Sequence, residues 1–254
     1  ALITGIVVIG GLKRIAEVAS YLVPFMGSIY FGAMLIAILL NFELVVPALK
    51  LIFVDAFNGT AVAGGTFIGV LIYGVRRGAF SNEAGMGTES LVHGVAKVSN
   101  PVKQGLVAMT GPIFDTLIIC TATALIILIS GVWETSASQG VTLTSEAFNL
   151  LLGDIGGFIL FACVICFGLS TIFTYSYYGA TCARFIFGNF GMNFYIYLYI
   201  IGIFIYSIVP IDIAINIADG AFAMMAIPTL ISALWLAPKV MQESRNYFKL
   251  IDNA

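Results

Sequence analysis

The sequence predicts an all-α fold, a multi-pass bundle of transmembrane helices, and two observations carry this prediction. Of the 254 residues, 60% are hydrophobic and only 9% are charged, whereas a soluble domain carries about 25% charged residues. The mean hydropathy of +1.05 arises from long apolar runs, several near the length of about 20 residues that crosses a bilayer. A soluble enzyme domain and a disordered chain are excluded, and a net charge of −2 offers no basic face for nucleic acid.

The chain begins with Ala1 and an apolar run that meets its first charge at Lys13. This run is shorter than a membrane span, and no basic region precedes it, as a signal peptide would require. We therefore expect the chain to start inside a helix of a longer protein. A full-length span is predicted at 21–42, and the mixed segment at 43–57 is expected to be an interfacial or loop segment.

The next span is interrupted. A short apolar piece at 62–75 ends at Arg76 and Arg77, the stretch G-A-F-S-N-E-A-G-M-G occupies 78–87, and a second piece continues to about Val98. Non-helical backbone at membrane depth survives only where it is buried in protein or lines a wet cavity. In transporters its free N–H and C=O groups bind substrates and ions. A glycine-kinked structural helix or a tight hairpin is the alternative.

Further spans are predicted at 105–132, 148–183, 194–209 and 211–237, and the polar tail is expected to leave the membrane. If successive helix ends alternate between the two sides, and Arg76 and Arg77 of the interrupted segment are not counted, Lys50 alone falls on one side. Short loops rich in Lys and Arg face the cytoplasm, so the opposite side is predicted to be cytoplasmic. It receives Lys13, Arg14, Lys97, Lys103, Arg184, Lys239, Arg245 and Lys249.

A second polar cluster, F-G-L-S-T-I-F-T-Y-S-Y-Y-G, lies within an apolar run at 167–179. Ser170 and Thr171 are adjacent hydroxyls, and Thr171 and Tyr175 are four residues apart, which places them on one face of a helix. Such hydroxyls often bond back to their own helix or pack against a neighbour. The residues alone leave an ion site and a structural role open.

The stretch G-V-R-R-G-A-F-S-N-E-A-G-M-G, followed by His93 and then N-P-V-K-Q-G at 100–105, resembles the signature region of the alanine/glycine:cation symporter family. I-G-G-L-K-R-I-A-E-V-A and V-P-F-M before it, and I-A-D-G-A-F-A-M-M-A-I-P after it, extend the resemblance over essentially the whole chain. It implies a prokaryotic cell-membrane transporter, not an enzyme. The implied partners are the lipid bilayer, a small neutral amino acid (alanine or glycine), and Na⁺ or sometimes H⁺ as the coupling ion.

The resemblance also implies a leucine-transporter-like fold of inverted five-plus-five repeats, in which the interrupted span is the sixth core helix. Residues 1–254 would then form a single transmembrane domain, the C-terminal part of a larger transporter. Residues 1–60 would hold the last helices of the first repeat, 61–238 the second repeat and 239–254 a cytoplasmic tail. The broken helix of the first repeat would be missing.

Roles carry over residue by residue from the same resemblance. Ser170 and Thr171 would supply hydroxyls to Na⁺, while Thr171 and Tyr175 would face the substrate. The family usually has Trp where Tyr175 stands, and it has S-A-P in place of T-E-S at 88–90, which adds Glu89. This added carboxylate could titrate or pair with Arg76, Arg77 or Lys97. The implied substrate-binding residues of the interruption are Phe80, Ser81, Asn82, Glu83, Gly85, Met86 and Gly87.

Other polar residues support different readings. His93, the one histidine, has no second ligand at metal spacing and is assigned to packing or helix polarity. Asp115 and Asp219 would stabilise the bundle or serve a proton path. An intramembrane aspartyl protease would carry Tyr-Asp in one helix and G-x-G-D in the next. Asp115 instead follows Phe114, and Asp154 sits in L-L-G-D, which lacks the first Gly, so the protease pattern fails. An ion channel would need a pore loop repeated by symmetry. No segment of this sequence is repeated, and the single interruption favours a carrier.

Overall fold

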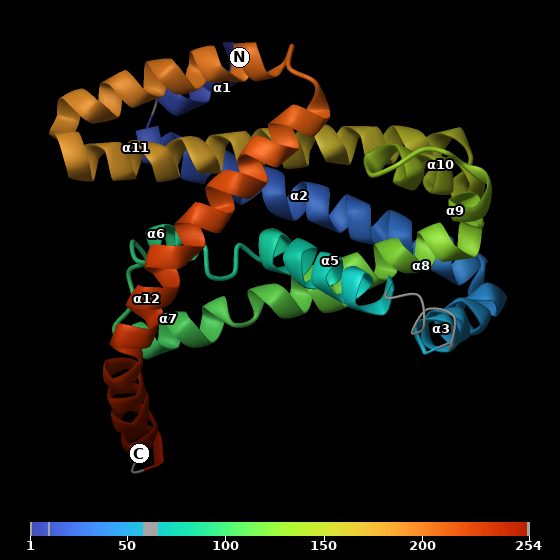
Figure 1. Cartoon of the computed structure of the whole chain (residues 1–254), viewed down its shortest axis with the longest axis horizontal. Coiled ribbons are helices and arrows are strands. Elements are labelled where there is room, and N and C mark those ends of the chain that lie inside the picture. Colours follow the sequence, from blue (N-terminus) through green and yellow to red (C-terminus); the bar gives the residue numbers. More distant parts are fainter. Residues whose placement is uncertain (1, 10, 58–65, 253–254) are drawn as a thin grey trace. The chain divides into compact units, whose positions relative to one another are not determined.

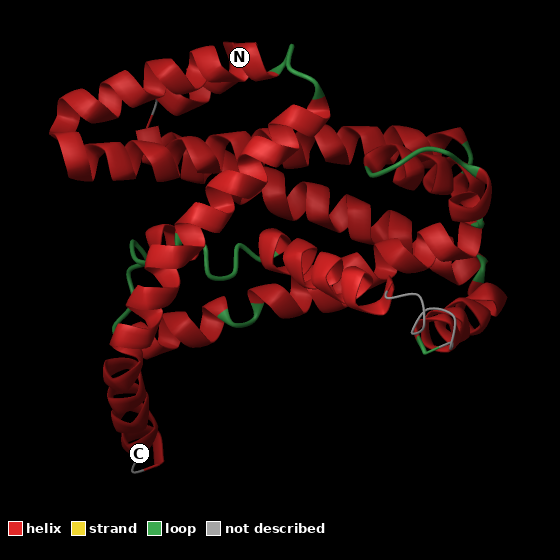
Figure 2. Cartoon of the chain, viewed as in Figure 1, coloured by secondary structure: helices red, strands yellow, loops and turns green. Residues whose placement is uncertain are grey.

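The computed structural model describes residues 2–9, 11–57 and 66–252, and the regular elements within these ranges are all helices (Figure 2). Many large apolar side chains face outward, including Phe185 at 91% and Trp235 at 83% exposure. Apolar surface of this extent is foreign to a soluble monomer and suits contact with lipid. By length and composition, four stretches can cross a membrane: Glu17–Leu40, Pro101–Ser130, Asp154–Tyr206 and Ile213–Ile251. The predicted all-helical class is confirmed.

The chain divides into two compact units. The first unit comprises Ala1–Gly74 and Thr116–Ile201, and the second comprises Val75–Asp115 and Gly202–Ala254. The helices that lie wholly or mainly in the first unit are α1 (Leu2–Ile9), α2 (Gly11–Leu40), α3 (Phe42–Ala56), α5 (Thr66–Ser81), the π-helix η1 (Ile113–Cys120), α8 (Thr121–Ser130), α9 (Val132–Thr135), α10 (Val141–Leu152) and α11 (Asp154–Tyr206).

The core of the first unit forms where α2, α8 and α10 meet (Figure 1). The ring of Tyr30 stacks on Phe148 with centroids 5.7 Å apart, and Met34 and Ile126 are fully buried beside them. The hydroxyls of Tyr30 and Thr123 lie 2.9 Å apart and hydrogen bond to each other. This bond matters because an unpaired hydroxyl in an apolar core is costly.

The mixed segment at 43–57, expected to be interfacial or a loop, is largely helical and forms α3. Its apolar residues recur with the helical period at Leu44, Ala48 and Leu51, and Ala48 is buried. Pro47 lies inside this helix. The helix therefore forms despite this proline and the three charges Glu43, Lys50 and Asp55.

The predicted spans 148–183 and 194–209 belong to one long helix, α11, with a kink at Gly188 (φ 68°). The predicted start at residue 148 is wrong. Phe148 ends up in α10 because Gly153, with φ 70°, separates α10 from α11. A left-handed backbone angle of this kind is one that glycine adopts at no steric cost.

The second unit contains the end of α5 (Thr66–Ser81), α6 (Thr88–His93), α7 (Pro101–Ala108), the start of the π-helix η1 (Ile113–Cys120) and α12 (Ile211–Asp252). Contacts between the helices join α6 to α7 and α7 to α12.

Several boundaries in the second unit differ from prediction. The piece expected to continue to Val98 ends at His93, and residues 62–65 of the interrupted span lie outside the described residues. The span predicted from 105 begins at Pro101, where Asn100 Oδ1 accepts a hydrogen bond from the amide of Val102 at 2.8 Å. An Asn cap followed by Pro at the first position is a strong start for a helix.

Candidate functional site

The interruption predicted from the glycine pattern is present. Helix α5 ends at Ser81, α6 begins at Thr88, and residues 82–87, called the interruption below, are turns and bends. Three residues take left-handed backbone angles: Glu83 (φ 52°), Gly85 (φ 77°) and Gly87 (φ 84°). Glu83 is the one non-glycine residue with positive φ among those described, and such strain in a non-glycine residue concentrates at functional sites.

Local hydrogen bonds hold the start of the interruption. The amide of Asn82 donates to Gly78 O at 3.1 Å, and the amide of Ala84 donates to Ala79 O at 2.9 Å. The side-chain amide of Asn82 also donates to Gly78 O at 2.9 Å. The carbonyl groups at the end of α5 are thus partly satisfied by the turn that follows them, which gives the interruption a defined geometry.

An acidic side chain from η1 meets the last residue of α5. Ser81 donates from Oγ to Asp115 Oδ2 at 2.5 Å. Sequence reasoning named both residues but did not connect them, because they are 34 positions apart. It also did not predict a π-helix around Asp115, a rare form that is frequent at functional sites.

The end of α5 and the interruption pack along α12. The ring of Phe80 meets Phe222 edge-on with centroids 4.8 Å apart. A Cβ added to Gly87 would lie 2.8 Å from Thr229 Oγ1, and one added to Gly85 would lie 3.7 Å from Leu230. Only glycine allows the chain to approach Thr229 this closely at residue 87.

The predicted substrate-binding residues at the end of α5 and in the interruption differ in exposure. Met86 is buried, Asn82, Glu83, Gly85 and Gly87 are partly buried, and Phe80 and Ser81 are exposed. Sequence reasoning did not include Thr88, which is 2% exposed. Its Oγ1 has no hydrogen-bond partner among the described residues. A buried polar atom of this kind calls for a ligand or a water molecule.

The charged groups near the interruption form one ion pair that the sequence did not reveal. Arg76 donates to Asp219 Oδ2, and the side chain of Asp219 is only 9% exposed. The sequence had suggested that the added Glu89 could titrate or pair with Arg76, Arg77 or Lys97. The carboxylate that meets Arg76 is instead that of Asp219.

The predicted Na⁺ and substrate hydroxyls lie on α11, in the first unit. Ser170 is 8% exposed, and its Oγ donates to Phe167 O at 2.9 Å. Thr171 is exposed, and the ring of Tyr175, partly buried, lies 5.3 Å from that of Tyr178. Ser170 thus makes the bond back to its own helix that is common for hydroxyls in apolar helices.

His93 has a structural partner. Its Nδ1 lies 2.7 Å from Nε2 of Gln104, a hydrogen bond that links α6 to α7. No group of three His, Cys, Asp or Glu side chains placed to hold a metal ion occurs within the described ranges. The residue that His93 contacts, Gln104, belongs to the N-P-V-K-Q-G motif.

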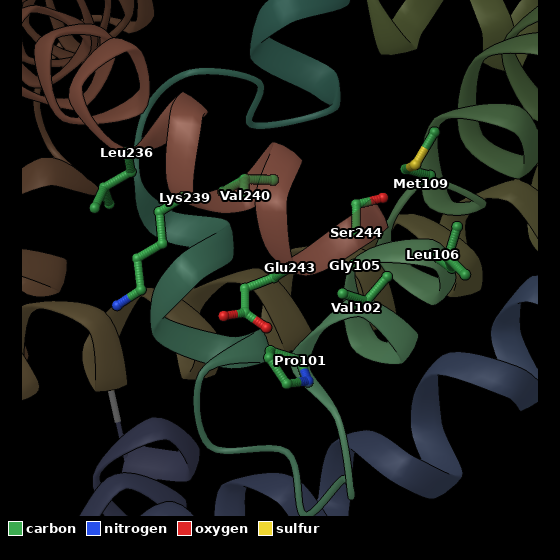
Figure 3. Close-up of a pocket in the computed structure, with 10 residues that line it drawn as sticks. All are labelled: Pro101, Val102, Gly105, Leu106, Met109, Leu236, Lys239, Val240, Glu243 and Ser244. Carbon is green, nitrogen blue, oxygen red and sulfur yellow. The ribbon is translucent and has the colours of Figure 1, made fainter. Parts of the chain in front are cut away.

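The second unit also contains an open groove of about 610 Å³ between α7 and α12. Figure 3 shows Leu106 and Met109 on one side and Val240 on the other, with the carboxylate of Glu243 near Pro101. Its walls are largely apolar. A zwitterionic amino acid needs convergent polar partners, so this groove does not suit a small amino acid. Its lining is Pro101, Val102, Gly105, Leu106, Met109, Leu236, Lys239, Val240, Glu243 and Ser244.

Comparisons with known proteins agree with the helical, membrane-spanning character of the chain. The family model described as the sodium:alanine symporter family matches residues 1–253. An uncharacterized transporter of Haemophilus influenzae is 36% identical over 98% of this chain and 56% of its own length. The sodium/alanine symporter AgcS of Methanococcus maripaludis is 34% identical over 100% of this chain and 56% of its own length.

A third relative is named for a different amino acid. The probable sodium/glutamine symporter GlnT of Bacillus subtilis is 33% identical over 96% of this chain and 51% of its own length. The chain spans about half the length of the curated relatives that it matches. The family and these relatives are transporters rather than enzymes, as the sequence resemblance implied. The match over residues 1–253 shows that this chain, an integral membrane protein, belongs to the sodium:alanine symporter family.

Proposed function

We propose that the protein couples the uptake of a small neutral amino acid, alanine or glycine, to Na⁺ across a prokaryotic cell membrane. One observation carries this proposal beyond family membership: an interruption with three left-handed residues inside an apolar helical segment. Backbone groups released at such a break bind substrates and ions in secondary transporters.

The size of the substrate follows from the chemistry of the interruption. Gly85 and Gly87 hold the left-handed turns that leave N–H and C=O groups outside a helix, and such groups can bind the ammonium and carboxylate of a compact amino acid. Phe80, Ser81, Asn82, Glu83 and Met86 would complete this half of the pocket. The buried Oγ1 of Thr88, directly after the interruption, is a further group that a bound substrate or its water can satisfy.

Ser170 and Thr171 are proposed to provide oxygen ligands to Na⁺. In the Ser170 hydroxyl, the proton points to Phe167 O, which leaves the oxygen lone pairs available to a cation. Hard cations prefer oxygen ligands, and Na⁺ is such a cation. Thr171 and Tyr175, one helical turn apart, would contact the substrate.

A leucine-transporter-like arrangement is proposed for the whole protein. Residues 1–60 would close the first repeat, 61–238 would form the second, and 239–254 would lie in the cytoplasm. Because Na⁺ and the amino acid bind the same occluded state, each raises the affinity for the other by the same factor.

Uptake of radiolabelled alanine tests this proposal. The protein expressed from its complete reading frame is reconstituted in liposomes, and uptake is driven by an inward Na⁺ gradient, an inward H⁺ gradient, or neither. Saturable uptake that requires the Na⁺ gradient and is inhibited by unlabelled glycine is the expected result. Uptake driven only by the H⁺ gradient would overturn the Na⁺ assignment, and the absence of any alanine or glycine uptake would overturn the substrate assignment.

A further inference from the structure

Within the second unit, α5 is attached to α12 by two contacts one helical turn apart. Arg76 donates to the carboxylate of Asp219, and Phe80 meets Phe222 edge-on. Arg76 and Phe80 are four residues apart, and Asp219 and Phe222 are three apart, so each pair lies on one face of its helix. The last turn of α5 cannot rotate about its axis without breaking one of these contacts.

The two side chains of the ion pair differ in burial, so the buried partner needs the contact more than the exposed partner does. The side chain of Asp219 is 9% exposed, and that of Arg76 is 54% exposed. A carboxylate removed from water needs a counter-charge, whereas the guanidinium of Arg76 keeps access to its surroundings. The buried carboxylate of Asp219 therefore holds Arg76, and with it the end of α5, against α12.

We propose that Asp219 is a positioning residue for transport, which acts through Arg76 to orient the interruption. The interruption begins at Asn82, six residues after Arg76 and directly after the helix end that the pair fixes. This inference rests on the proposed function, because it assigns a role to the geometry of the same substrate site. A site whose competent geometry is populated in a fraction of molecules binds its ligand more weakly by that fraction.

The kinetic test compares KM and the maximal rate for alanine in reconstituted protein from the complete reading frame. Asp219→Asn is expected to raise KM about tenfold, within the range of measured couplings between sites, while the maximal rate changes less than twofold. Glu243→Gln is the matched control, since it removes a carboxylate charge from the same helix at a position away from the interruption. Arg76→Gln should raise KM by a similar factor.

The double variant separates positioning from charge neutralisation. If the two residues act through one contact, R76Q/D219N raises KM about as much as either single change. A double variant with the KM of the parent would show that the pair only neutralises a buried charge, and would overturn the proposal. So would an unchanged KM in D219N, or single effects that multiply in the double variant.

A readout that needs no transport completes the test. Amide hydrogen exchange of residues 78–93 in the absence of substrate should be faster in D219N and unchanged in E243Q. If the parent protein takes up no amino acid but the exchange differs as expected, the proposed function fails and the positioning is supported. Parent uptake with unchanged KM and exchange in D219N overturns the positioning alone. If D219N cannot be purified, R76Q/D219N, which leaves no unpaired charge, carries both measurements.

Discussion

Replacement of Gly87 by Ala tests whether the interruption depends on its close approach to α12. Gly87 has φ 84°, and its added Cβ would lie 2.8 Å from Thr229 Oγ1. That oxygen is itself held in place, because it donates a hydrogen bond to Met225 O at 2.9 Å. The new methyl group therefore displaces a bonded hydroxyl and strains the backbone at once.

The two costs can be estimated separately. A left-handed backbone angle costs an alanine about 1–2 kcal/mol, and loss of the Thr229 hydrogen bond costs about 1 kcal/mol. The free energy needed to open the interruption should then fall by about 2–3 kcal/mol. In amide exchange of residues 82–90 this corresponds to a rate increase of about 30- to 150-fold.

Two control variants separate the cost of backbone strain from the cost of the clash with Thr229. Gly131 has φ 70° and no atom within 4 Å of an added Cβ, so Gly131→Ala should show backbone strain without a clash. Thr229→Ala removes the displaced hydroxyl, so G87A/T229A should recover about 1 kcal/mol relative to the sum of the single changes. If G87A disturbs its own segment no more than G131A does, the close approach to α12 is not a constraint and the reasoning is refuted.

Three further predictions concern the first unit. Replacing Ser170 and Thr171 with Ala should raise the Na⁺ concentration for half-maximal alanine uptake about tenfold, as loss of oxygen contacts to a charge implies; an unchanged Na⁺ dependence would place the ion elsewhere. Tyr175→Trp should lower alanine uptake about tenfold relative to glycine, since a pocket that loses the space of one methyl group discriminates by about that factor; a constant ratio of the two uptakes would show that the side chain does not face the substrate. Hydrogen bonds from Ser136 and from Ser138, the latter at 2.6 Å, lower the pKa of Glu146. The stabilisation that these bonds give is therefore complete above the ordinary carboxyl range, and it is lost as the pH falls through the lowered pKa. Ser138→Ala should therefore reduce the thermal stability of the protein at neutral pH and make no difference in strong acid, and a stability difference that persists in acid would contradict this cause.

The interruption could be predicted from the sequence because its signals are local. The glycines of G-A-F-S-N-E-A-G-M-G stand between two apolar pieces, and glycine adopts left-handed angles at no steric cost. The predicted helix boundaries were less accurate where one or two residues decided them. Gly153 moved the start of α11 to Asp154, and Asn100 with Pro101 moved the start of the next span.

The contacts around the interruption could not be predicted, because they join distant parts of the chain. Arg76 and Asp219 are 143 positions apart, and Ser81 and Asp115 are 34 apart. Each acid could be recognised as unusual in an apolar run, but no pattern within the run named its partner. The π-helical turn around Asp115 was equally hidden, since its sequence I-F-D-T-L-I-I-C has no feature that separates it from an α-helix.

Helix α12 continues past its contact with α5 to Asp252. Thirty residues of helix separate Phe222 from that end, about 45 Å at 1.5 Å per residue, which exceeds the roughly 30 Å hydrocarbon core of a bilayer. Pro228 and Pro238 lie within this length, so a tilt at Phe222 is transmitted to the far end as far as the helix stays straight across them. A tilt of about 10° at Phe222 would swing the far end by about 8 Å over that length, so a spectroscopic label near Arg245 would magnify movements of the buried site into a signal readable from the water phase.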